Sequence, residues 1–486
     1  MSNSIEVPLP SNNNHARQVL LVSCYELGHQ PVGLAMPIGF LNRAGVAAET
    51  MDMSVEEFDP EKAKRARFAG ISVPMHTALR LGVQVAREIR QLNPECHICF
   101  FGLYASLNSD YLLQGFADSI IGGEYEEELV ERVKSFFGET SPRQQPAVGA
   151  KPVLARLSFP VPDRSELVPL DRYAKLEYKG KQRLAGYVEA SRGCLHLCTH
   201  CPIPPVYEGR FFVVSEQVVL EDIRNQVASG ARHITFGDPD FLNGPGHSLS
   251  IARAVHQEFP ELTFDFTAKI EHILKHQALL PEFARLGCVF VVSAAESLSE
   301  TVLERLQKGH NRRDVSQAFE ALAGAGIALR PSFVSFTPWT TIDDFIDVLE
   351  FVDSRNLIDH VDPVQYSIRL LVPPGSLLLS SPDKERWLGP LIQESFTYGW
   401  RHSDRRMDEL QRLVTALVEQ AASAGEDAET TFDRIREVAY AVKGEPAPER
   451  KRERTNPLRL RPPRLTEAWF CCAEPTRDQF VTLGKK

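Results

Sequence analysis

Three cysteines stand close together in residues 190–201, which read ASRGCLHLCTHC and follow the apolar run 185–188. Cys194, Cys198 and Cys201 have the spacing C-x3-C-x2-C. Three thiolates on one short loop can each bind a different iron of a cubane cluster, which leaves the fourth iron open to a small chelating molecule. The spacing therefore predicts a loop, placed directly after a strand, that binds a 4Fe-4S cluster with one open iron.

Zinc binding, a disulfide and simple core packing are the alternatives for these thiols. A structural zinc site normally takes four ligands in two pairs, and no matching pair or C-x2-C-H partner lies nearby in the sequence. A disulfide would leave one of the three thiols over, and three buried cysteines at this spacing by chance would be unusual. The cluster accounts for all three residues.

The stretch resembles the signature of the radical S-adenosylmethionine (SAM) superfamily. His200 matches the aromatic residue that commonly precedes the third cysteine in that signature, and Arg192-Gly193 matches the usual lead-in. The resemblance implies that the open iron holds the amino and carboxylate groups of SAM, and that SAM cleavage yields a 5'-deoxyadenosyl radical. It also implies an electron donor such as flavodoxin or ferredoxin.

Composition narrows the partners and the compartment. The 486 residues suffice for two or three domains. A net charge of -10 argues against a nucleic-acid backbone as the main partner, so we expect a small or peptide-derived substrate. The sequence has no run of about eighteen apolar residues, and residues 1–17 lack the apolar core of a signal peptide. We therefore expect no membrane partner and a cytoplasmic protein whose nine cysteines stay reduced.

The first part of the chain divides into three segments. Residues 1–17 are a polar lead that we expect to be disordered. Residues 18–140 alternate short apolar strands with helices, which predicts a doubly wound, Rossmann-like parallel sheet of α/β class. Residues 141–184 begin as a linker rich in Pro, Gln and Ala and continue as a segment that resembles the lead-in to a radical SAM barrel.

The glycines of the first sheet, Gly70, Gly102 and Gly122-Gly123, resemble the pattern of the cobalamin-binding domain found before many radical SAM barrels. Members that bind cobalamin through a histidine carry D-x-H-x-x-G after the first strand. The loop here reads ELGHQPVG, so His29 lacks the aspartate and its glycine comes one place late. Some members also lack this histidine, and cobalamin therefore stays an open alternative.

A second group of thiols, Cys96 and Cys99, lies in a predicted strand at residues 96–102. Residues three apart in a strand point to opposite faces, and the neighbours are apolar. We expect both to be core cysteines and not metal ligands.

Residues 185–380 repeat strand and helix six times, with the cysteine loop after the first strand. This pattern predicts a partial, TIM-like (β/α)6 parallel barrel whose site lies at the carboxyl ends of the strands. The sixth strand is expected at 364–370. Residues 381–444 predict a helical extension that begins near Trp387. Residues 445–486 begin with prolines and a basic run, which predict a solvated tether, and end in a distinct tail.

Loops after the strands supply candidate SAM ligands. Gly237 and Asp238 follow the second barrel strand, where the family often has a glycine and a carboxylate that receive the SAM amino group. A fixed carboxylate aligns an ammonium group, and glycine lets the backbone approach. Asp240 lies in the same loop but is explained equally well as a helix cap. Asp238 is therefore preferred.

Further candidates follow the later strands. Glu296 ends the fourth strand and matches the family's acidic residue for the ribose hydroxyls, with a glutamate at a helix start as the alternative. Lys269 ends the third strand and faces either the SAM carboxylate or solvent. After the fifth strand, residues 335–341 resemble the stretch that covers adenine, with Phe336 in it and Trp339 as a stacking surface.

The tail carries two adjacent cysteines in the motif WFCCAEP, residues 469–475. It resembles the tail of a radical SAM group that ends in Cys-Cys-Ala-Glu-Pro or in the same motif with selenocysteine (the CCAEP/CUAEP-tail group). Exchange of sulfur for selenium suits a reactive chalcogen better than a packed one, so Cys471 and Cys472 are candidate catalytic residues. Packing of both thiols beside Phe470 is the alternative.

These resemblances predict an enzyme that abstracts hydrogen from an unactivated position of its substrate. A cobalamin-dependent radical SAM methyltransferase is the alternative among enzymes. A cluster-bearing sensor or partner protein that no longer cleaves SAM is the alternative of another class, and the retained SAM-type loops argue against it.

Overall fold

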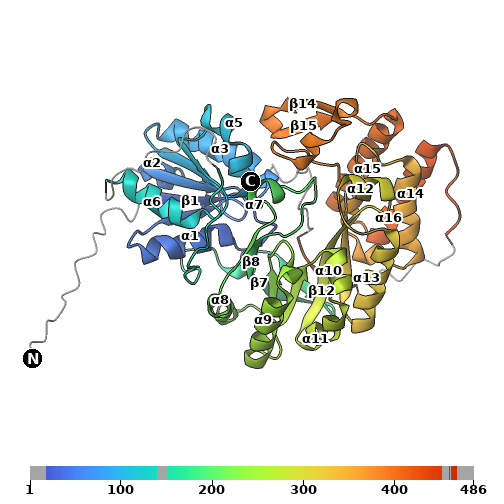
Figure 1. Ribbon diagram of the computed structural model, residues 1–486, viewed down its shortest axis with the longest axis horizontal. Helices are drawn as coiled ribbons and strands as arrows, with labels where there is room; N and C mark the ends of the chain where they lie inside the picture. The colour runs from blue at the N-terminus through green and yellow to red at the C-terminus, as the bar shows by residue number, and fades with distance from the viewer. Residues whose placement is uncertain (1–17, 139–150, 451–458, 460, 468–486) are drawn as a thin grey trace, which may run out of the picture.

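The computed structural model describes residues 18–138, 151–450, 459 and 461–467. Two sheets lie side by side: a blue N-terminal unit and a green-to-yellow barrel, with the last helices in orange and red at the outer side of the barrel (Figure 1). None of the helices in these residues combines the length and the apolar character that a membrane crossing needs.

The N-terminal unit is a five-stranded parallel sheet with strand order β2-β1-β3-β4-β5. Helices α1 and α6 cover one face and α2 to α5 cover the other, and each face has its own buried apolar cluster. The predicted doubly wound sheet is confirmed. Its elements are β1 (Val19–Ser23), α1 (Val32–Arg43), β2 (Glu49–Asp52), α2 (Pro60–Arg65), β3 (Phe68–Ser72), α3 (His76–Leu92), β4 (His97–Phe101), α4 (Leu103–Leu107), α5 (Ser109–Leu113), β5 (Ser119–Ile121) and α6 (Glu126–Phe136).

Cys96 and Cys99 are fully buried thiols. Cys96 belongs to the apolar cluster beneath α3, and Cys99 belongs to the cluster beneath α1 and α6. The two side chains therefore lie on opposite faces of the sheet, and the prediction of core cysteines is confirmed.

The second sheet has the order β13-β12-β11-β10-β7-β6-β16. The five strands from β7 to β13 are parallel, and β6 and β16 are antiparallel to their neighbours. This is the predicted partial barrel. Its elements are β6 (Lys175–Tyr178), β7 (Lys181–Val188), β8 (Ser191–Gly193), α7 (Pro204–Tyr207), β9 (Phe211–Val213), α8 (Glu216–Ala228), β10 (His233–Phe236), η3 (Phe241–Asn243), α9 (Pro245–Glu258), β11 (Thr263–Thr267), α10 (Ile270–Lys275), η4 (Gln277–Leu279), α11 (Leu280–Arg285), β12 (Cys288–Glu296), α12 (Glu300–Arg305), α13 (Arg312–Ala325), β13 (Ala328–Phe333) and α14 (Ile342–Ser354).

The helices of the barrel bury their apolar faces against the outside of this sheet. One buried residue from each major helix enters the same apolar cluster: Ile223, Ile251, Ile273, Phe283, Val315 and Leu349. These residues hold the helices on the outer face of the sheet. The functional site of such a barrel lies at the carboxyl ends of its parallel strands.

The sixth strand predicted over 364–370 is wrong in extent. Residues Pro363–Ser367 form a 3-10 helix, η6, and only Arg369 then pairs with Phe336 as a parallel bridge. Pro363 begins η6, and its fixed φ suits the first position of a helical turn, so residues 363–367 leave the strand conformation. Irregular chain therefore completes this edge of the barrel.

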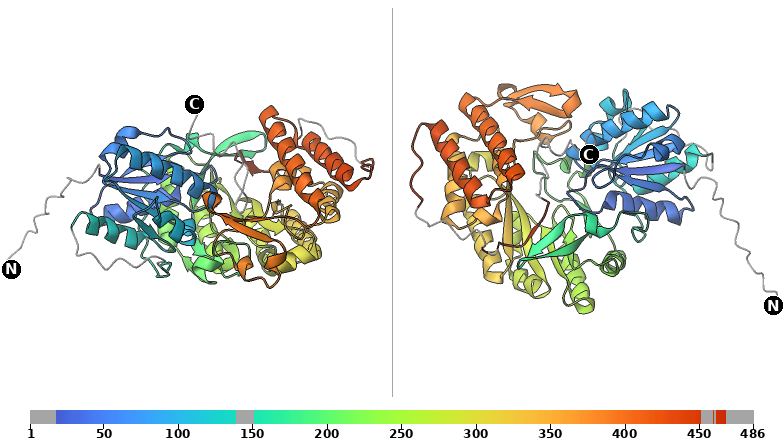
Figure 2. Two further views of the ribbon diagram at one scale, coloured as in Figure 1. Left: turned by 90° about the horizontal axis from the view of Figure 1, so that it is seen from above. Right: turned by 180° about the vertical axis from the view of Figure 1, so that it is seen from behind.

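The chain after Trp387 first forms a hairpin, so the predicted helical start is also wrong. Strands β14 (Leu388–Ile392) and β15 (Thr397–Trp400) pair antiparallel, and the Thr-Tyr-Gly-Trp sequence of β15 is rich in residues that favour strands. Helices α15 (Arg405–Ala424) and α16 (Ala428–Lys443) follow and pack against each other outside the barrel (Figure 2).

The solvated tether predicted for 445–464 is wrong for the residues described there. Arg450 makes ion pairs of 2.8 Å with Asp353 on α14 and with Asp433 on α16. Arg464 makes one of 2.7 Å with Glu177 on β6. The basic run alone could not reveal these acidic partners, since they come from distant elements.

The last described segment runs along the edge of the barrel toward the N-terminal unit. Strand β16 (Arg464–Leu465) pairs with β6, and Glu467 then accepts a hydrogen bond of 2.7 Å from the hydroxyl of Tyr25. The predicted tail residues Cys471 and Cys472 lie outside the described residues.

Candidate active site

A pocket of about 350 Å³ lies between the carboxyl ends of the two sheets. The N-terminal unit lines it with His29, Ser72 and Gly102, among others, which follow or end strands of the first sheet. The barrel lines it with the cysteine loop and with residues at the ends of β10, β11, β12 and β13. Both halves of the chain therefore contribute to one site.

The cysteine loop enters this pocket directly after β8. Cys194, Cys198 and Cys201 all line the pocket and stand as thiols, not disulfides. Gly193 precedes them with a φ of +73°, and a Cβ there would meet the carbonyl of Arg210 at 2.4 Å. Only glycine suits this turn.

The donor set fits a 4Fe-4S cluster with an open iron. Three thiols come from one loop, and the other described cysteines, Cys24, Cys96, Cys99 and Cys288, are buried in the cores. Among the described residues, no cysteine therefore supplies a fourth ligand. Burial raises the pKa of the Cys194 thiol, and coordination to iron would offset this cost, since metals bind the thiolate.

Lys308 is a buried cation beside the cysteine loop that the sequence did not single out. It is 3% exposed. Burial lowers its pKa, but the charges of Glu296, Cys198 and Cys201 outweigh burial and leave the pKa above its usual value. A fixed positive charge here stabilises negative charge on the thiolates.

His200 and Glu296, both predicted, meet each other in the structure. Glu296 Oε1 lies 3.0 Å from His200 Nε2 and accepts a hydrogen bond of 3.3 Å from Lys308 Nζ. Burial alone would raise the pKa of Glu296, but Lys308 and then His200 outweigh it and hold the pKa at about 2. Glu296 is therefore an ionised acceptor at the pocket wall.

Asp238 supports the strand end that leads into the cysteine loop. Its carboxylate accepts a hydrogen bond of 2.9 Å from the N–H of Ala190 and one of 2.5 Å from the hydroxyl of Ser191. Burial raises its pKa to about 7, although both hydrogen bonds oppose the rise. Gly237 is required beside it, because a Cβ there would lie 2.1 Å from the ring of Tyr187.

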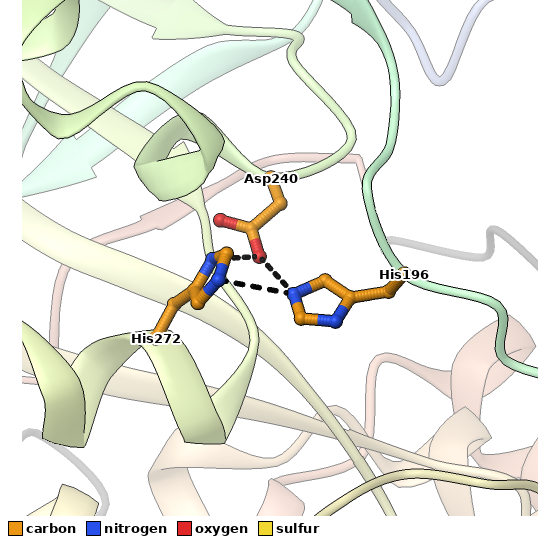
Figure 3. A group of neighbouring side chains, drawn as sticks. All are labelled: His196, Asp240 and His272. Carbon is orange, nitrogen blue, oxygen red and sulfur yellow. Dashed lines mark hydrogen bonds and ion pairs between the residues drawn. The ribbon is translucent and has the colours of Figure 1, made fainter. Parts of the chain in front are cut away.

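Asp240 both caps a turn and joins a polar cluster. Its carboxylate accepts a hydrogen bond of 2.9 Å from the N–H of Leu242 at the start of η3, which is the predicted cap. The same carboxylate points toward His196 and His272 (Figure 3). His272 and the contact between the two histidines could not be inferred from spacing, since they lie on separate elements.

Lys269 is not a solvated lysine of the barrel rim. It is 9% exposed, lines the pocket, and places Nζ 3.2 Å from both His196 Nδ1 and Glu271 Oε2. An ammonium group in this position can receive a carboxylate from the pocket side.

Phe336 and Trp339 are placed away from the pocket lining. Phe336 is buried with its ring 5.0 Å from that of Phe345, and Trp339 makes an edge contact of 5.3 Å with Trp387. Aromatic packing within the core accounts for both side chains, and the end of β13 reaches the pocket through Phe333 and its neighbours.

A buried charge cluster joins the N-terminal unit to the cysteine loop. Arg192 Nη1 donates to Glu126 Oε1 at 2.5 Å, and its Nε donates to Glu189 Oε2 at 2.8 Å. Glu124 accepts a hydrogen bond of 2.9 Å from the hydroxyl of Tyr207. Arg192 directly precedes the loop glycine, so this cluster fixes the loop against the first sheet.

His29 faces the pocket from the N-terminal unit. Its ring stacks on Tyr187 with 4.4 Å between centroids, and it is 4% exposed. Burial, and to a lesser degree His233, lowers the pKa of His29 to about 3, so the imidazole is neutral. A neutral imidazole retains a lone pair for a metal.

Residues 188–352 match the family model described as the radical SAM superfamily. This chain carries a radical SAM domain. A domain of this superfamily implies a 4Fe-4S cluster and SAM, in agreement with the cluster predicted from the cysteine spacing and with the SAM that the resemblance implies.

Curated relatives match the chain in part. A tRNA-2-methylthio-N(6)-dimethylallyladenosine synthase of Desulfosudis oleivorans is 27% identical over 199 residues, which is 39% of this chain and 42% of that protein. A hopanoid C-3 methylase of Methylococcus capsulatus is 23% identical over 330 residues, which is 64% of this chain and 62% of that protein. The chain spans about half the length of the curated relatives it matches.

A solved structure shares the fold over most of the chain. It is OxsB, a cobalamin-dependent SAM radical enzyme with aqua-cobalamin and SAM bound. The TM-score is 0.67, the sequence identity 14%, and the match covers 87% of this chain and 72% of that one. At 14% identity, this match shows that the two proteins share a fold and nothing further.

Proposed function

We propose that this protein is a radical SAM enzyme that holds a 4Fe-4S cluster on Cys194, Cys198 and Cys201 and modifies a small or peptide-derived substrate. The observation that carries the proposal is that one loop brings three thiols into a pocket shared by both sheets. When bound, the cluster and SAM supply a reductive cleavage that produces a 5'-deoxyadenosyl radical. The cytoplasm, a reducing compartment, suits such a cluster.

Three residues around the loop are suited to bind different groups of SAM. Asp238 accepts two hydrogen bonds within the protein, and a carboxylate has about four lone-pair sites, so it retains room for the SAM amino group. Lys269 offers an ammonium to the SAM carboxylate. Glu296, kept ionised by Lys308, has the charge needed to accept hydrogen bonds from the ribose hydroxyls.

Cobalamin-dependent methyl transfer is a second candidate, favoured by one observation. Loops at the carboxyl ends of the first sheet, including His29 and Gly102, face the same pocket as the cysteine loop. Ligands of doubly wound sheets bind at this edge. A cobalamin there would supply a methyl carrier beside the cluster, and His29 is the neutral side chain on that wall able to bind its cobalt.

We further propose that Cys471 and Cys472 act in the reaction, as the resemblance to the CCAEP/CUAEP tail implies. The described chain ends at Glu467, which lines the pocket and bonds to Tyr25. Cys471 is four residues further along the chain, outside the described residues.

Metal loading tests whether the three loop cysteines bind the cluster. Wild-type protein and a variant with all three loop cysteines changed to alanine are reconstituted anaerobically with iron and sulfide. We expect about four irons per chain and a reduced-cluster electron paramagnetic resonance signal that SAM changes, in the wild type alone. Cys288→Ala, which removes a core thiol, is the control and should load normally. A triple variant that still carries a full cluster would exclude this loop as the site.

The class of substrate needs its own test, because relatives named for tRNA modification are among the matches. The holoenzyme is incubated with SAM, reductant and either total tRNA, a peptide library or a small-molecule extract. We expect SAM consumption to rise with a peptide or small-molecule fraction. Stimulation by tRNA alone would overturn the substrate class and leave the cluster assignment intact.

A further inference from the structure

We propose that His196, Asp240 and His272 bind a divalent transition-metal ion beside the cysteine loop, separate from the iron–sulfur cluster. The three side chains come from three elements. His196 lies within the loop, Asp240 follows β10, and His272 is in the first turn of α10. Figure 3 shows them pointing toward one common point.

The spacing of the donor atoms suits one ion. His272 Nδ1 lies 2.9 Å from Asp240 Oδ2, and His196 Nε2 lies 3.7 Å from the same oxygen. One ligand atom from each residue can be chosen so that all lie within 4.8 Å of one another. Tetrahedral zinc with bonds of about 2.0–2.1 Å places its ligand atoms roughly 3.3 Å apart. The observed distances fall on either side of that value.

His272 supplies a second, independent sign of a missing ligand. The residue is only 6% exposed, yet its Nδ1 makes no hydrogen bond with any described residue. Asp240 Oδ2 lies within ion-pair distance of this nitrogen, at 2.9 Å, but forms no hydrogen bond with it. A buried nitrogen without a hydrogen bond is uncommon in proteins, and a metal on its lone pair would satisfy it.

Lys269 and Glu271 are the close polar neighbours of His196 Nδ1. Lys269 Nζ now lies 3.2 Å from His196 Nδ1 and 3.2 Å from Glu271 Oε2. If His196 binds a metal through Nε2, its Nδ1 must carry a proton and donate it to an acceptor. Glu271 Oε2, 3.9 Å from Nδ1, is that acceptor once Lys269 turns away. Lys269 therefore weakens metal binding at this site, and Glu271 strengthens it.

Two histidines and one carboxylate favour zinc, iron or a similar ion over magnesium or calcium, which prefer oxygen ligands. Three protein ligands also leave one or more coordination positions open. His196 and Asp240 line the pocket, so an open position would face its contents and could take water, a carboxylate or a thiolate.

Zinc binding to the full-length protein tests the site. Cluster-loaded wild type is stripped of loosely bound metal, dialysed against a low concentration of Zn²⁺, and its zinc and iron are counted. We expect one zinc per chain with the iron unchanged. X-ray absorption at the zinc edge should show nitrogen and oxygen ligands at about 2.0–2.1 Å and no sulfur at about 2.3 Å.

Matched variants separate this site from general surface binding. His272→Ala and Asp240→Asn should each weaken zinc binding by more than the roughly 10- to 100-fold that loss of an outer hydrogen-bond partner costs. His276→Ala is the control, because that histidine is also at α10, with its ring 5.8 Å from His272, and is not a ligand. Lys269→Met should tighten zinc binding, since it removes a positive charge beside the ion.

Several results would overturn the proposal: no zinc retained by wild type, sulfur in the zinc shell, or wild-type affinity in His272→Ala. If that variant does not fold, unchanged affinity in both Asp240→Asn and Lys269→Met would do the same. The inference does not depend on the proposed function. The variant without loop cysteines cannot load iron there but should still bind zinc, so failure of either assignment is seen separately.

Discussion

Removing Lys308 probes the electrostatics of the site most sharply. The substitution Lys308→Met keeps most of the side-chain volume and deletes the charge. Glu296 then stays buried and keeps its contact with His200. We expect a large loss of stability in the cluster-free protein, and a change in how stability depends on pH.

The size of the loss follows from the geometry. Lys308 Nζ and Glu296 Oε1 are 3.3 Å apart, and the two side chains are 4% and 6% exposed. At an effective dielectric constant of about 20, Coulomb's law gives roughly 5 kcal/mol for such a pair. Removal of one partner from a buried pair typically costs about 3–5 kcal/mol, because the other charge stays buried. We expect a loss in that range.

The pH dependence should change sign. In the wild type, burial raises the pKa of Glu296, but Lys308 and His200 outweigh it and hold it at about 2, below its ordinary 4.5. This stabilisation is complete above pH 4.5 and is lost as pH falls toward 2. Without Lys308, burial should bring the pKa above 4.5. The variant would then be stabilised by the neutral acid below pH 4.5 and lose this stability as pH rises through the raised pKa of Glu296.

Urea unfolding followed by tryptophan fluorescence measures both effects. Three of the four tryptophans, at positions 339, 387 and 400, lie in or against the apolar cluster of the barrel, so their signal reports on the barrel and its extension. The double variant Lys308→Met/Glu296→Gln should recover most of the loss, since no unpaired charge is left. A loss under about 1 kcal/mol, or no coupling between the two positions, would refute the reasoning.

Three further predictions concern the neighbouring groups. Asp238→Ala and Glu296→Ala should each weaken SAM binding by about 1.5–3 kcal/mol in calorimetry, since each removes a charged acceptor, and unchanged affinity would mean that neither is a ligand. Glu126→Gln should lower the free energy of unfolding by about 1.5–3 kcal/mol, because it weakens a buried hydrogen bond to Arg192. The control is Glu128→Gln on the same helix, which removes a partly exposed ion pair and should cost less than about 1 kcal/mol. Cys471→Ser and Cys472→Ser should abolish turnover of the native substrate, and wild-type rates with coupled SAM use in both would make the tail structural.

Local pattern was enough to predict the architecture. Alternating strands and helices predicted the parallel sheets, and the face alternation of a strand assigned Cys96 and Cys99 to opposite cores. The errors arose where contacts with distant elements determine the local structure. The 3-10 helix η6, which begins at Pro363, replaces most of the sixth strand. Acidic residues on α14 and α16 pair with Arg450, which the basic run alone placed in solvent.

The site was predictable only where its residues are adjacent in sequence. The spacing of the three loop cysteines is enough by itself to predict a 4Fe-4S cluster. Lys308 and His272 have no such pattern, since each lies alone after or within a helix and reaches the site through folding. Trp339 has the aromatic surface expected of an adenine contact, yet packing against Trp387 decides its position.

Formation of 5'-deoxyadenosine tests the central claim most directly. Anaerobically reconstituted wild type is mixed with SAM and dithionite, and the product is measured beside the iron content of the same sample. We predict 5'-deoxyadenosine from wild type with about four irons per chain, and none from the variant lacking Cys194, Cys198 and Cys201. A wild-type protein that carries the full cluster and leaves SAM intact would contradict the proposed function and identify an iron–sulfur protein without this chemistry.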